Sequence, residues 1–467
     1  MTGTAISLRS LADTLADICG RRYVATDEET LFMYGKDQTL NLSFPFDILV
    51  KPGTPEEIAA VLKVCNRHKV PVTPRGGGSG VTGGALPARR GVVLSLERLN
   101  KIITINTTDA YVVAESGVVT ADMCHAVKQA GLYFPVLPTS GFWSFVGGNV
   151  AQNAGSINSC KYGTTAQYVL NLEVVLPSGE IVWTGANVTK NATGFNLTSL
   201  FAGSEGVLGI ITKVVYRLLP LPAHEVVLLA AFQEPEHACR VVAAIKQSAV
   251  TPSAVELITE NAIKITATYL RAPLPLVKKQ IKAHLLIEFQ ETTEAALDRS
   301  MELAAGIIEK FTTEEILTAY TAAEKELLWK LRMNIGYAMT SNNKYYRDID
   351  IVVPLSLLYQ YITTVEEICA RHQIEVACFG HALDGNLHTM LLANTADPVQ
   401  EENFRKTARE IYSYALARGG VISGEHGIGL LQQEFMPLQF SAAHLALMQS
   451  IKTLFDPNGI LNPGKIF

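Results

Sequence analysis

Two short segments near the C-terminal end of the 467-residue chain carry side chains that could hold a metal and move a proton. In the first, His381 and His388 stand on either side of an Asp-Gly turn, so both imidazoles can reach one point if the flanks are strands. The second, Ser423–Gly429, adds the carboxylate of Glu425 and the imidazole of His426. Two histidines and one glutamate are a typical ligand set for a divalent cation with open positions for substrate. His426 would then remain as a general base, because imidazole titrates near neutral pH.

These residues have simpler interpretations when each is taken alone. A single histidine is more often a hydrogen-bonded structural residue than a ligand, so the prediction rests on the four groups together. The chain has no His-Glu-x-x-His, which argues against a zinc protease. Arg332 follows an apolar, helix-like stretch and could pair with a substrate carboxylate. Its spacing alone favours the other interpretation, a side chain that reaches solvent.

A glycine-rich loop forms the second candidate site. Six glycines lie between Gly76 and Gly84, directly after Arg75. Glycine serves where the backbone takes a positive φ or approaches a ligand closely. Successive N–H groups in such a loop form a concave nest for an anion, and Arg75 adds a charged donor at its rim. The loop therefore predicts a site for the pyrophosphate of a dinucleotide.

Two better-known phosphate loops do not fit this stretch. Gly78, Gly80 and Gly83 spell Gly-x-Gly-x-x-Gly, but a Rossmann fingerprint must open a helix, and Pro87 follows too soon. No Gly-Lys-Ser/Thr is present, so the stretch is no P-loop. A flexible linker is disfavoured by the strand-like Lys69–Val72 before the loop.

The elements that must position these residues follow from local signals. Asp47–Lys51 reads as a strand, and Thr54-Pro55-Glu56-Glu57 as a helix start with an N-cap, proline at the first position and a capping box. A strand at Val70–Thr73 completes a β-α-β unit that delivers the glycine loop. Beyond Leu219–Pro222, strands alternate with helices, which indicates a second α+β domain on an antiparallel sheet. We expect domains at residues 1–221 and 222–410, with 411–467 completing the active site.

Composition narrows the function class. The chain is 48% hydrophobic and 18% charged with a net charge of −5, which favours large cores and gives no sign of nucleic-acid binding. No apolar run could span a bilayer, and Met1–Thr4 lacks signal-peptide character. Seven cysteines without Cys-x-x-Cys argue against iron–sulfur clusters in this chain and suit a reducing cytoplasm. Contact with the inner membrane surface and a homodimer remain open.

Several motifs together resemble the FAD-linked 2-hydroxy-acid dehydrogenases. This family includes D-lactate dehydrogenases, the flavin subunit of glycolate oxidase and D-2-hydroxyglutarate dehydrogenase, and has the flavin fold of vanillyl-alcohol oxidase. The resemblance implies an α+β, two-lobed flavoprotein with a PCMH-type FAD-binding domain and an α+β cap domain on an antiparallel sheet. The motifs are the glycine loop, Gly147–Gly155, Gly203–Gly206, Gly380–His388, Ser423–Gly429 and Asn462–Lys465.

The resemblance also assigns roles to residues. It implies a divalent metal, often zinc or manganese, on His381, His388 and Glu425, with His426 as the base. Asn386 and Arg332 would hold the substrate. FAD is expected to be non-covalent, because relatives with covalent flavin often carry a histidine where Ser79 stands. The residues implied for FAD are Arg75, Gly76, Gly77, Gly78, Ser79, Gly80, Pro138, Thr139, Ser140, Gly148, Asn149, Glu205, Gly206, Ile211 and Asn462.

Two departures from the family pattern bear on the site. Leu383 replaces the first glycine of the usual Gly-Asp-Gly-Asn turn, which puts the geometry of that turn in question. Asp348, beside Arg347, stands where hydroxyglutarate-type members usually carry a lysine. Since a distal carboxylate would be repelled by Asp348, we expect a small D-2-hydroxy monocarboxylate such as D-lactate.

The chain is therefore predicted to be an FAD-linked D-2-hydroxy-acid dehydrogenase that passes electrons to a separate acceptor. That acceptor could be a quinone, an electron-transfer flavoprotein or an iron–sulfur subunit. D-2-Hydroxyglutarate and glycolate remain alternative substrates. An ether-lipid synthase of the same fold, which needs no metal set, and a non-catalytic flavin-binding subunit are the rival functions.

Overall fold

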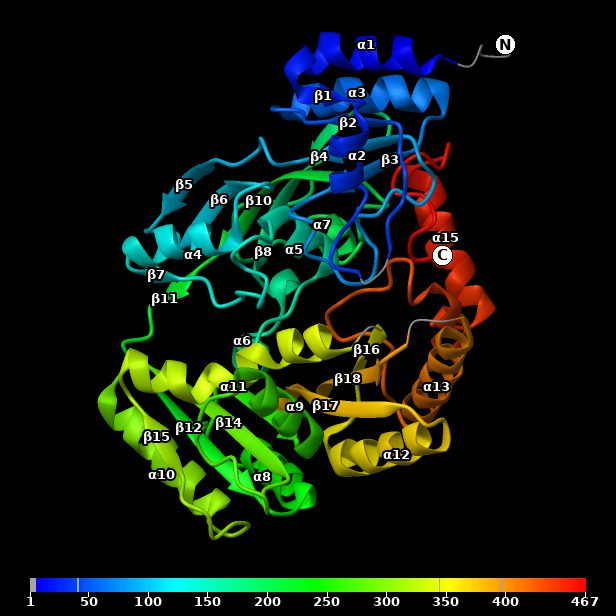
Figure 1. Cartoon of the computed structure of the whole chain (residues 1–467). Helices are drawn as coiled ribbons and strands as arrows, with labels where there is room; N and C mark the ends of the chain where they lie inside the picture. Colours follow the sequence, from blue (N-terminus) through cyan, green and yellow to red (C-terminus); the bar gives the residue numbers. More distant parts are fainter. Residues whose placement is uncertain (1–5, 40–41, 344, 396–397) are drawn as a thin grey trace. The chain divides into compact units, whose positions relative to one another are not determined.

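The computed structural model describes residues 6–39, 42–343, 345–395 and 398–467, and the chain divides into two compact units (Figure 1). Unit 1 contains the described residues of Met1–Ser156, Thr164–Pro220 and Glu425–Phe467. Unit 2 contains those of Ile157–Gly163 and Leu221–Gly424. The expectation for Met1–Thr4 lies outside the described residues.

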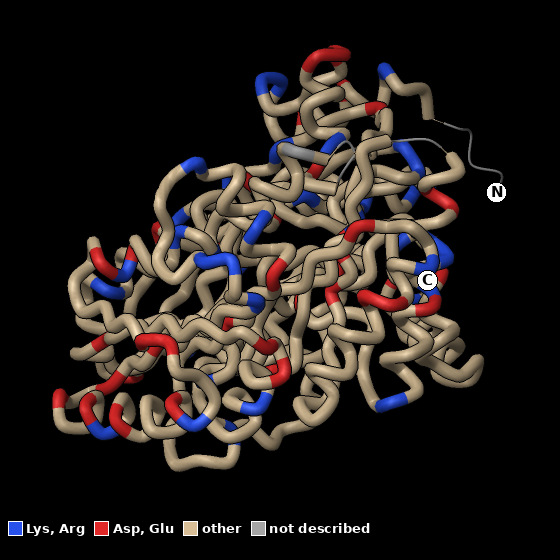
Figure 2. Tube along the Cα trace, turned by 60° about the horizontal axis from the view of Figure 1, so that its bottom comes forward, with Lys and Arg blue, Asp and Glu red and all other residues tan. Residues whose placement is uncertain are grey.

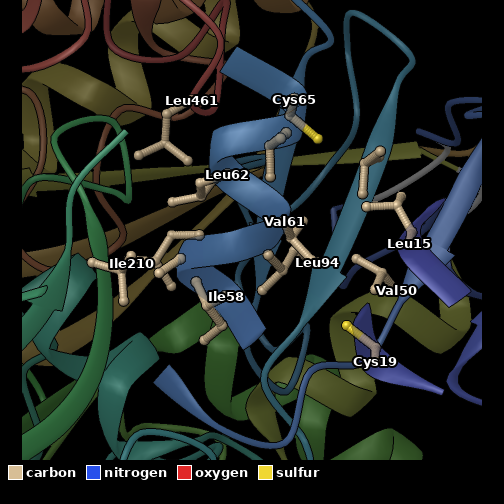
Figure 3. Close-up of a cluster of buried hydrophobic side chains, with 14 of the residues drawn as sticks. Leu15, Cys19, Val50, Ile58, Val61, Leu62, Cys65, Leu94, Ile210 and Leu461 are labelled. Carbon is tan, nitrogen blue, oxygen red and sulfur yellow. The ribbon is translucent and has the colours of Figure 1, made fainter. Parts of the chain in front are cut away.

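The β-α-β unit that carries the glycine loop is present in unit 1. Its sheet has the order β1-β2-β4-β3, and β2, β4 and β3 run parallel. Helix α3 packs on this sheet, and its Ile58, Val61, Leu62 and Cys65 lie in the buried cluster of Figure 3. The strands are β1 (Val24–Ala25), β2 (Ile48–Val50), β3 (Val72–Arg75) and β4 (Val92–Ser95), with helices α1 (Leu8–Cys19), α2 (Glu28–Tyr34) and α3 (Pro55–His68).

The predicted start of α3 is correct except for the capping box. Thr54 is the N-cap, its side chain accepts a hydrogen bond from the Glu57 N–H, and Pro55 opens the helix. The Glu57 carboxylate does not return to Thr54. It accepts from the Gly53 N–H at 2.6 Å and from Arg98 at 3.4 Å, because the Arg98 guanidinium draws it away from the cap.

A second, antiparallel sheet in unit 1 has the order β5-β6-β10-β8-β9. The predicted hairpin turn at Pro177–Gly179 joins β8 to β9. The elements are β5 (Ile102–Asn106), β6 (Tyr111–Glu115), β8 (Val169–Val175), β9 (Ile181–Trp183) and β10 (Ile210–Arg217), the pair β7 (Leu132–Tyr133) and β11 (Leu219–Pro220), and helices α4 (Thr120–Gln129), α5 (Val146–Gln152), α6 (Ser159–Tyr162), α7 (Leu197–Phe201), α14 (Met436–Gln439) and α15 (Ala442–Phe455), of which α6 belongs to unit 2.

Unit 2 is built on a seven-stranded sheet of order β15-β12-β14-β13-β17-β18-β16, in which every neighbouring pair is antiparallel. Helices α9 and α11 pack on one face, where Ile335 and Met339 meet Phe379 and Met390. The strands are β12 (His224–Phe232), β13 (Ala254–Thr259), β14 (Ala283–Glu291), β15 (Leu317–Ala319), β16 (Tyr345–Val352), β17 (Glu375–His381) and β18 (Asn386–Ala393). The helices are α8 (Pro235–Gln247), α9 (Glu260–Leu270), α10 (Glu294–Ile308), α11 (Ala322–Asn342), α12 (Leu358–Arg371) and α13 (Pro398–Leu416).

Charge is spread along the chain rather than gathered. Figure 2 shows Lys and Arg interspersed with Asp and Glu along the trace, in keeping with a net charge of −5. Among the described residues, no helix combines the length and hydropathy needed to cross a membrane.

Candidate active site

The glycine loop of unit 1 leaves open space beside its backbone. Gly77 is needed for packing, because a Cβ there would lie 2.0 Å from the carbonyl oxygen of Trp143. Gly78 has a φ of +69°, which favours glycine. Gly80 and Gly148 are different, since a Cβ at either position would meet no atom within 4 Å. Packing within the described chain therefore does not require glycine at these two positions, and both leave room for a ligand.

Helix α5 brings the second small-residue stretch to this loop. A Cβ on Gly76 would lie 3.8 Å from the Cα of Gly148, so the two stretches are neighbours in unit 1. Asn149 is buried and donates from Nδ2 to the Thr120 hydroxyl at 2.7 Å. Thr120 in turn donates to the carbonyl oxygen of Ser144, which fixes the turn that follows Pro138–Ser140. The glycine loop and the start of α5 thus lie next to one another in unit 1.

Arg75, the last residue of β3, has unused hydrogen-bonding capacity in this region. Its Nη1 is buried without a hydrogen-bond partner in the described part of the chain, and the same holds for Oδ2 of Asp37. Burial lowers the pKa of Arg75, while Asp37, Tyr34 and Glu97 raise it. Burial likewise raises the pKa of Asp37. A buried guanidinium with a donor to spare fits an anionic ligand, so the residues present fit the phosphates of a dinucleotide.

The side chains of Glu205 and Asn462 form hydrogen bonds with backbone groups of unit 1. The buried Glu205 carboxylate accepts from the N–H groups of Ile428 and Gly429, each at 2.7 Å. Burial raises the pKa of Glu205, and these two hydrogen bonds lower it. Asn462 donates from Nδ2 to the carbonyl oxygens of Glu205 and Gly84, at 2.7 and 3.1 Å. Asn462 therefore ties the C-terminal segment to the glycine loop, and Glu205 ties residues 428 and 429 to the Gly203–Gly206 stretch.

The remaining residues expected to bind the dinucleotide lie in the same unit. Gly206 has a φ of +71°, and a Cβ there would lie 2.8 Å from Cγ of Pro74, next to the glycine loop. Ile211 is buried in β10, beside Val174 of β8.

His426 is carried by unit 1 and is tethered to the same loop. Its backbone carbonyl accepts from the Thr82 hydroxyl at 3.0 Å, and the Leu430 N–H donates to the Thr82 carbonyl oxygen at 2.8 Å. The Nε2 of His426 lies 3.6 Å from Oε1 of Glu425. The backbone at His426 is therefore held by the glycine-rich stretch.

In unit 2, the predicted turn brings His381 and His388 together. Strands β17 and β18 pair in antiparallel fashion on either side of it. The two rings lie edge to face at 5.6 Å between centroids, and a nitrogen of each lies within 4.8 Å of the other. Leu383 does not strain this turn, because the left-handed position is Gly385, with a φ of +75°, while Leu383 packs its side chain inside. The question raised by the missing glycine is therefore resolved: the turn needs glycine only at residue 385.

The interpretation of Arg332 as a solvent-reaching side chain is wrong. Its side chain is 8% exposed, and its Nε donates to Oε2 of Glu256 at 2.6 Å. The other oxygen of Glu256 lies 2.5 Å from Nδ1 of His381. Burial alone would raise the pKa of Glu256, but Arg332 and His381 lower it to about 2, so the carboxylate stays ionised. The expected substrate-binding arginine and one expected metal ligand thus share a carboxylate that sequence reasoning missed.

A second carboxylate, Asp350, fixes the segment that leads to Glu425. Asp350 is 1% exposed, and its Oδ1 accepts from Nδ2 of Asn386 at 2.8 Å. Its Oδ2 accepts from the Ser423 hydroxyl and the Gly424 N–H, each at 2.9 Å. Because Asn386 also donates to the Ile351 carbonyl oxygen, both of its N–H groups are used within unit 2.

Strand alternation decides how Asp348 and Arg347 are placed. The Oδ2 of Asp348 lies 3.5 Å from Nδ1 of His388, so Asp348 lies on the histidine face of the sheet. Arg347, its neighbour in β16, points to the opposite face. The sequence left this choice open, because a shift of one residue exchanges the two.

A charge within a buried strand is the signal that could have revealed Glu256. The strand Ala254–Thr259 is buried at every position and is otherwise apolar around this residue. Since an ionised carboxylate is stable in such a place only when it is paired, the pattern predicts a buried partner without identifying it.

Protein families match both parts of the chain. The FAD binding domain family matches residues 46–185, and the C-terminal domain of FAD linked oxidases matches residues 221–466. The chain is 32% identical to glycolate oxidase subunit GlcD of Bacillus subtilis (strain 168), with 98% of this chain and 97% of that protein covered. It is 33% identical to a D-lactate dehydrogenase of Anaerostipes hadrus, with the same coverage. It is 31% identical to a D-2-hydroxyglutarate dehydrogenase of Stutzerimonas stutzeri (strain A1501), covering 98% and 99%.

Solved structures agree on the fold. A p-cresol methylhydroxylase with substrate bound superposes with a TM-score of 0.82 at 19% identity, over 98% of this chain and 96% of that chain. A 4-ethylphenol oxidase from Gulosibacter chungangensis gives 0.80 at 18% identity, over 100% and 98%. At these identities the likeness shows the fold alone. The predicted fold class, with its PCMH-type FAD-binding domain and an antiparallel sheet in the second part, is confirmed.

Proposed function

The chain belongs to the family of FAD-linked 2-hydroxy-acid dehydrogenases, and we propose that within it the protein oxidises a small D-2-hydroxy monocarboxylate of the D-lactate type to the 2-oxo acid. The relatives' names include glycolate, D-lactate and D-2-hydroxyglutarate. The observation that carries the choice among them is the position of Asp348, whose carboxylate lies 3.5 Å from His388 on the histidine face. A second carboxylate on the substrate would be repelled there.

The metal centre is part of this proposal. His381 and His388 present nitrogens to one another, and Glu425 follows directly after Gly424, which Asp350 anchors opposite His388. A nitrogen and oxygen donor set of this kind suits zinc or manganese. When bound, the metal would supply Lewis acidity toward the substrate hydroxyl and carboxylate.

The residues of this chain divide the remaining work. His426 takes the proton of the C2 hydroxyl at an imidazole nitrogen. Arg332, held side-on through Nε, keeps its Nη groups for the C1 carboxylate, and Asn386 helps to hold the substrate. When bound, FAD would accept the C2 hydride. The residues around the glycine loop and α5 would bind it, and Glu205 and Asn462 would hold these segments in place. Ser79 in the loop supports a non-covalent flavin.

Electrons are proposed to leave to a separate acceptor of one of three kinds: a quinone, an electron-transfer flavoprotein or an iron–sulfur subunit. The match to a protein named as a subunit supports a partner of this kind. All seven cysteines are unpaired, which supports a reducing, cytoplasmic location.

The wild-type protein and one variant test the proposal under anaerobic conditions. D-Lactate should bleach the wild-type flavin and yield one pyruvate per flavin. His426→Ala should keep its flavin and metal but lose about 10²–10⁴-fold in the rate of bleaching. Unchanged bleaching in His426→Ala, or wild-type flavin that stays oxidised with every 2-hydroxy acid, would contradict the proposal. The second outcome would favour a non-catalytic flavin subunit.

A further inference from the structure

Glu256 touches two of the proposed site residues at once. It lies in β13 with its side chain 0% exposed. Its Oε1 is 2.5 Å from His381 Nδ1, and its Oε2 is 2.6 Å from Arg332 Nε. The three residues come from β13, β17 and α11, so the contact joins parts of unit 2 that are remote in sequence. A charge buried this deeply is costly unless each oxygen is matched, and here each has one partner.

We propose that Glu256 is a positioning residue that sets the tautomer of His381 for metal binding and the orientation of Arg332 for the substrate carboxylate. This inference rests on the proposed function, because it takes His381 as a metal ligand and Arg332 as a substrate ligand.

The hydrogen-bond chemistry of the pair assigns the tautomer. An ionised carboxylate can only accept, so the nitrogen facing it, Nδ1 of His381, must carry the hydrogen. A neutral imidazole then has its lone pair on Nε2, which becomes the metal-binding atom. Metal-binding histidines commonly donate their other N–H to a carboxylate, and losing that partner typically lowers metal affinity about 10–100-fold. His388 has a similar but longer contact, at 3.5 Å from Asp348.

The second oxygen of Glu256 acts on Arg332. The contact through Nε holds the guanidinium side-on, with Cζ 5.0 Å from the centroid of the Phe379 ring. Held in this way, the planar group needs little further ordering to bind a carboxylate. Loss of Glu256 should therefore raise the KM for the 2-hydroxy acid in addition to weakening the metal.

Glu256→Gln is the sharpest substitution, because the side-chain amide has one acceptor and one donor. Arg332 cannot release a proton, so the new carbonyl oxygen must face it. The new NH₂ group then faces His381, whose Nδ1 must accept, and this moves the ring hydrogen to Nε2 and blocks the proposed metal-binding atom. The size of the side chain is unchanged, so packing is preserved.

Glu288→Gln provides a matched control. Glu288 lies on the neighbouring strand β14, in which Leu286 pairs with Glu256. Because Glu288 is two residues beyond Leu286, its side chain lies on the same face of the sheet as Glu256. It accepts hydrogen bonds from the Ser253 hydroxyl at 2.9 Å, the Asn158 amide at 3.2 Å and the Gln290 amide at 3.1 Å. This substitution also removes a buried carboxylate from unit 2, and none of these three donors is a residue of the proposed metal centre.

The test uses the full-length, flavin-loaded protein after metal removal. Each protein is dialysed to equilibrium against buffered Zn²⁺, and the zinc per flavin is counted by elemental mass spectrometry. We expect the Zn²⁺ Kd of Glu256→Gln to rise about 10–100-fold over wild type. Glu288→Gln should bind Zn²⁺ as the wild type does. Glu256→Asp, which keeps the charge but is one methylene shorter, serves if the glutamine variant does not fold, and should weaken zinc at least 10-fold.

Three results would overturn the inference. Equal Zn²⁺ affinity in Glu256→Gln and wild type, with only a lower melting temperature, would show that Glu256 merely balances the charge of Arg332 and would leave the proposed function intact. An equal loss in Glu288→Gln would show a general effect on the unit. A wild-type protein that binds no Zn²⁺ would remove the metal centre as well, and flavin bleaching by D-lactate would then tell separately whether the proposed oxidation survives.

Discussion

Asp350→Asn should loosen the segment that leads to Glu425 and His426. Asp350 accepts hydrogen bonds from Asn386 on Oδ1 and from Ser423 and Gly424 on Oδ2. Hydrogen bonds to a charged group are worth about 1.5–3 kcal/mol each. An asparagine keeps the shape but offers one acceptor, and its best orientation keeps that oxygen toward Ser423 and Gly424. Its NH₂ then opposes the NH₂ of Asn386.

The magnitude follows from this orientation. The contact with Asn386 is lost outright, at about 1.5–3 kcal/mol, and the two contacts on the other oxygen become neutral, at about 1 kcal/mol each. The summed local destabilisation is therefore about 3–5 kcal/mol. Ser423→Ala removes one of the three donors without leaving a donor facing a donor, and should cost about 1–2 kcal/mol.

Hydrogen exchange measures this effect where it occurs. A two-unit protein need not unfold in one step, so a global melting temperature averages over both units. Exchange of the amides of residues 421–424 and 386–388, followed by mass spectrometry, reports the local opening free energy. The expected order is wild type, Ser423→Ala, then Asp350→Asn, with the last losing the most protection. If the two variants lost equal protection, the charged hydrogen bonds would not be what anchors this segment.

Three further predictions concern specificity, acid stability and the flavin. Asp348→Lys should narrow or reverse the preference for D-lactate over D-2-hydroxyglutarate in kcat/KM, and an unchanged ratio would show that Asp348 does not face the substrate. His284 is buried with its Nε2 3.1 Å from the Leu276 carbonyl oxygen, and burial lowers its pKa to about 4 although that hydrogen bond raises it. The neutral ring therefore contributes stability above pH 6.5 that is lost as the pH falls toward 4, by about 3 kcal/mol, and His284→Gln should flatten the denaturation profile over this range. Acid precipitation should release intact FAD, whereas flavin retained in the pellet would show a covalent link despite Ser79.

Local chemistry explains which parts of the fold could be read from the sequence. The start of α3 was predictable because Thr54 and Pro55 act within one helical turn, and β2, β3 and β4 followed from short apolar runs. The glycine loop was recognisable because six glycines in nine positions have few structural uses. The capping box failed because Arg98, remote in sequence, competes for Glu57.

The contacts that sequence reasoning missed are the long-range ones. Arg332 was misread because its partner Glu256 lies 76 positions away, and no local pattern pairs the two. Glu205 and Asn462 form hydrogen bonds with backbone groups far along the chain, and no local pattern predicts these contacts. The histidine turn was predictable because the two histidines are separated by only six residues, whereas the carboxylates that orient them were not predictable.

The backbone around His426 is held within unit 1. Glu205 and Thr82 hold residues 426–430 against the glycine loop, so the proposed base belongs to the unit that carries the FAD-binding domain. His381, His388, Arg332 and Glu256 belong to the other unit.

Anaerobic flavin reduction across paired D- and L-2-hydroxy acids tests the central claim most directly. The flavin-loaded protein is mixed with D-lactate, L-lactate, glycolate and D-2-hydroxyglutarate, and the loss of flavin absorbance is followed in time. The account predicts the highest second-order rate for D-lactate and a lower one for D-2-hydroxyglutarate, because Asp348 lies beside His388. Faster reduction by D-2-hydroxyglutarate would contradict the assigned specificity, and no reduction by any of the four would contradict the assigned chemistry.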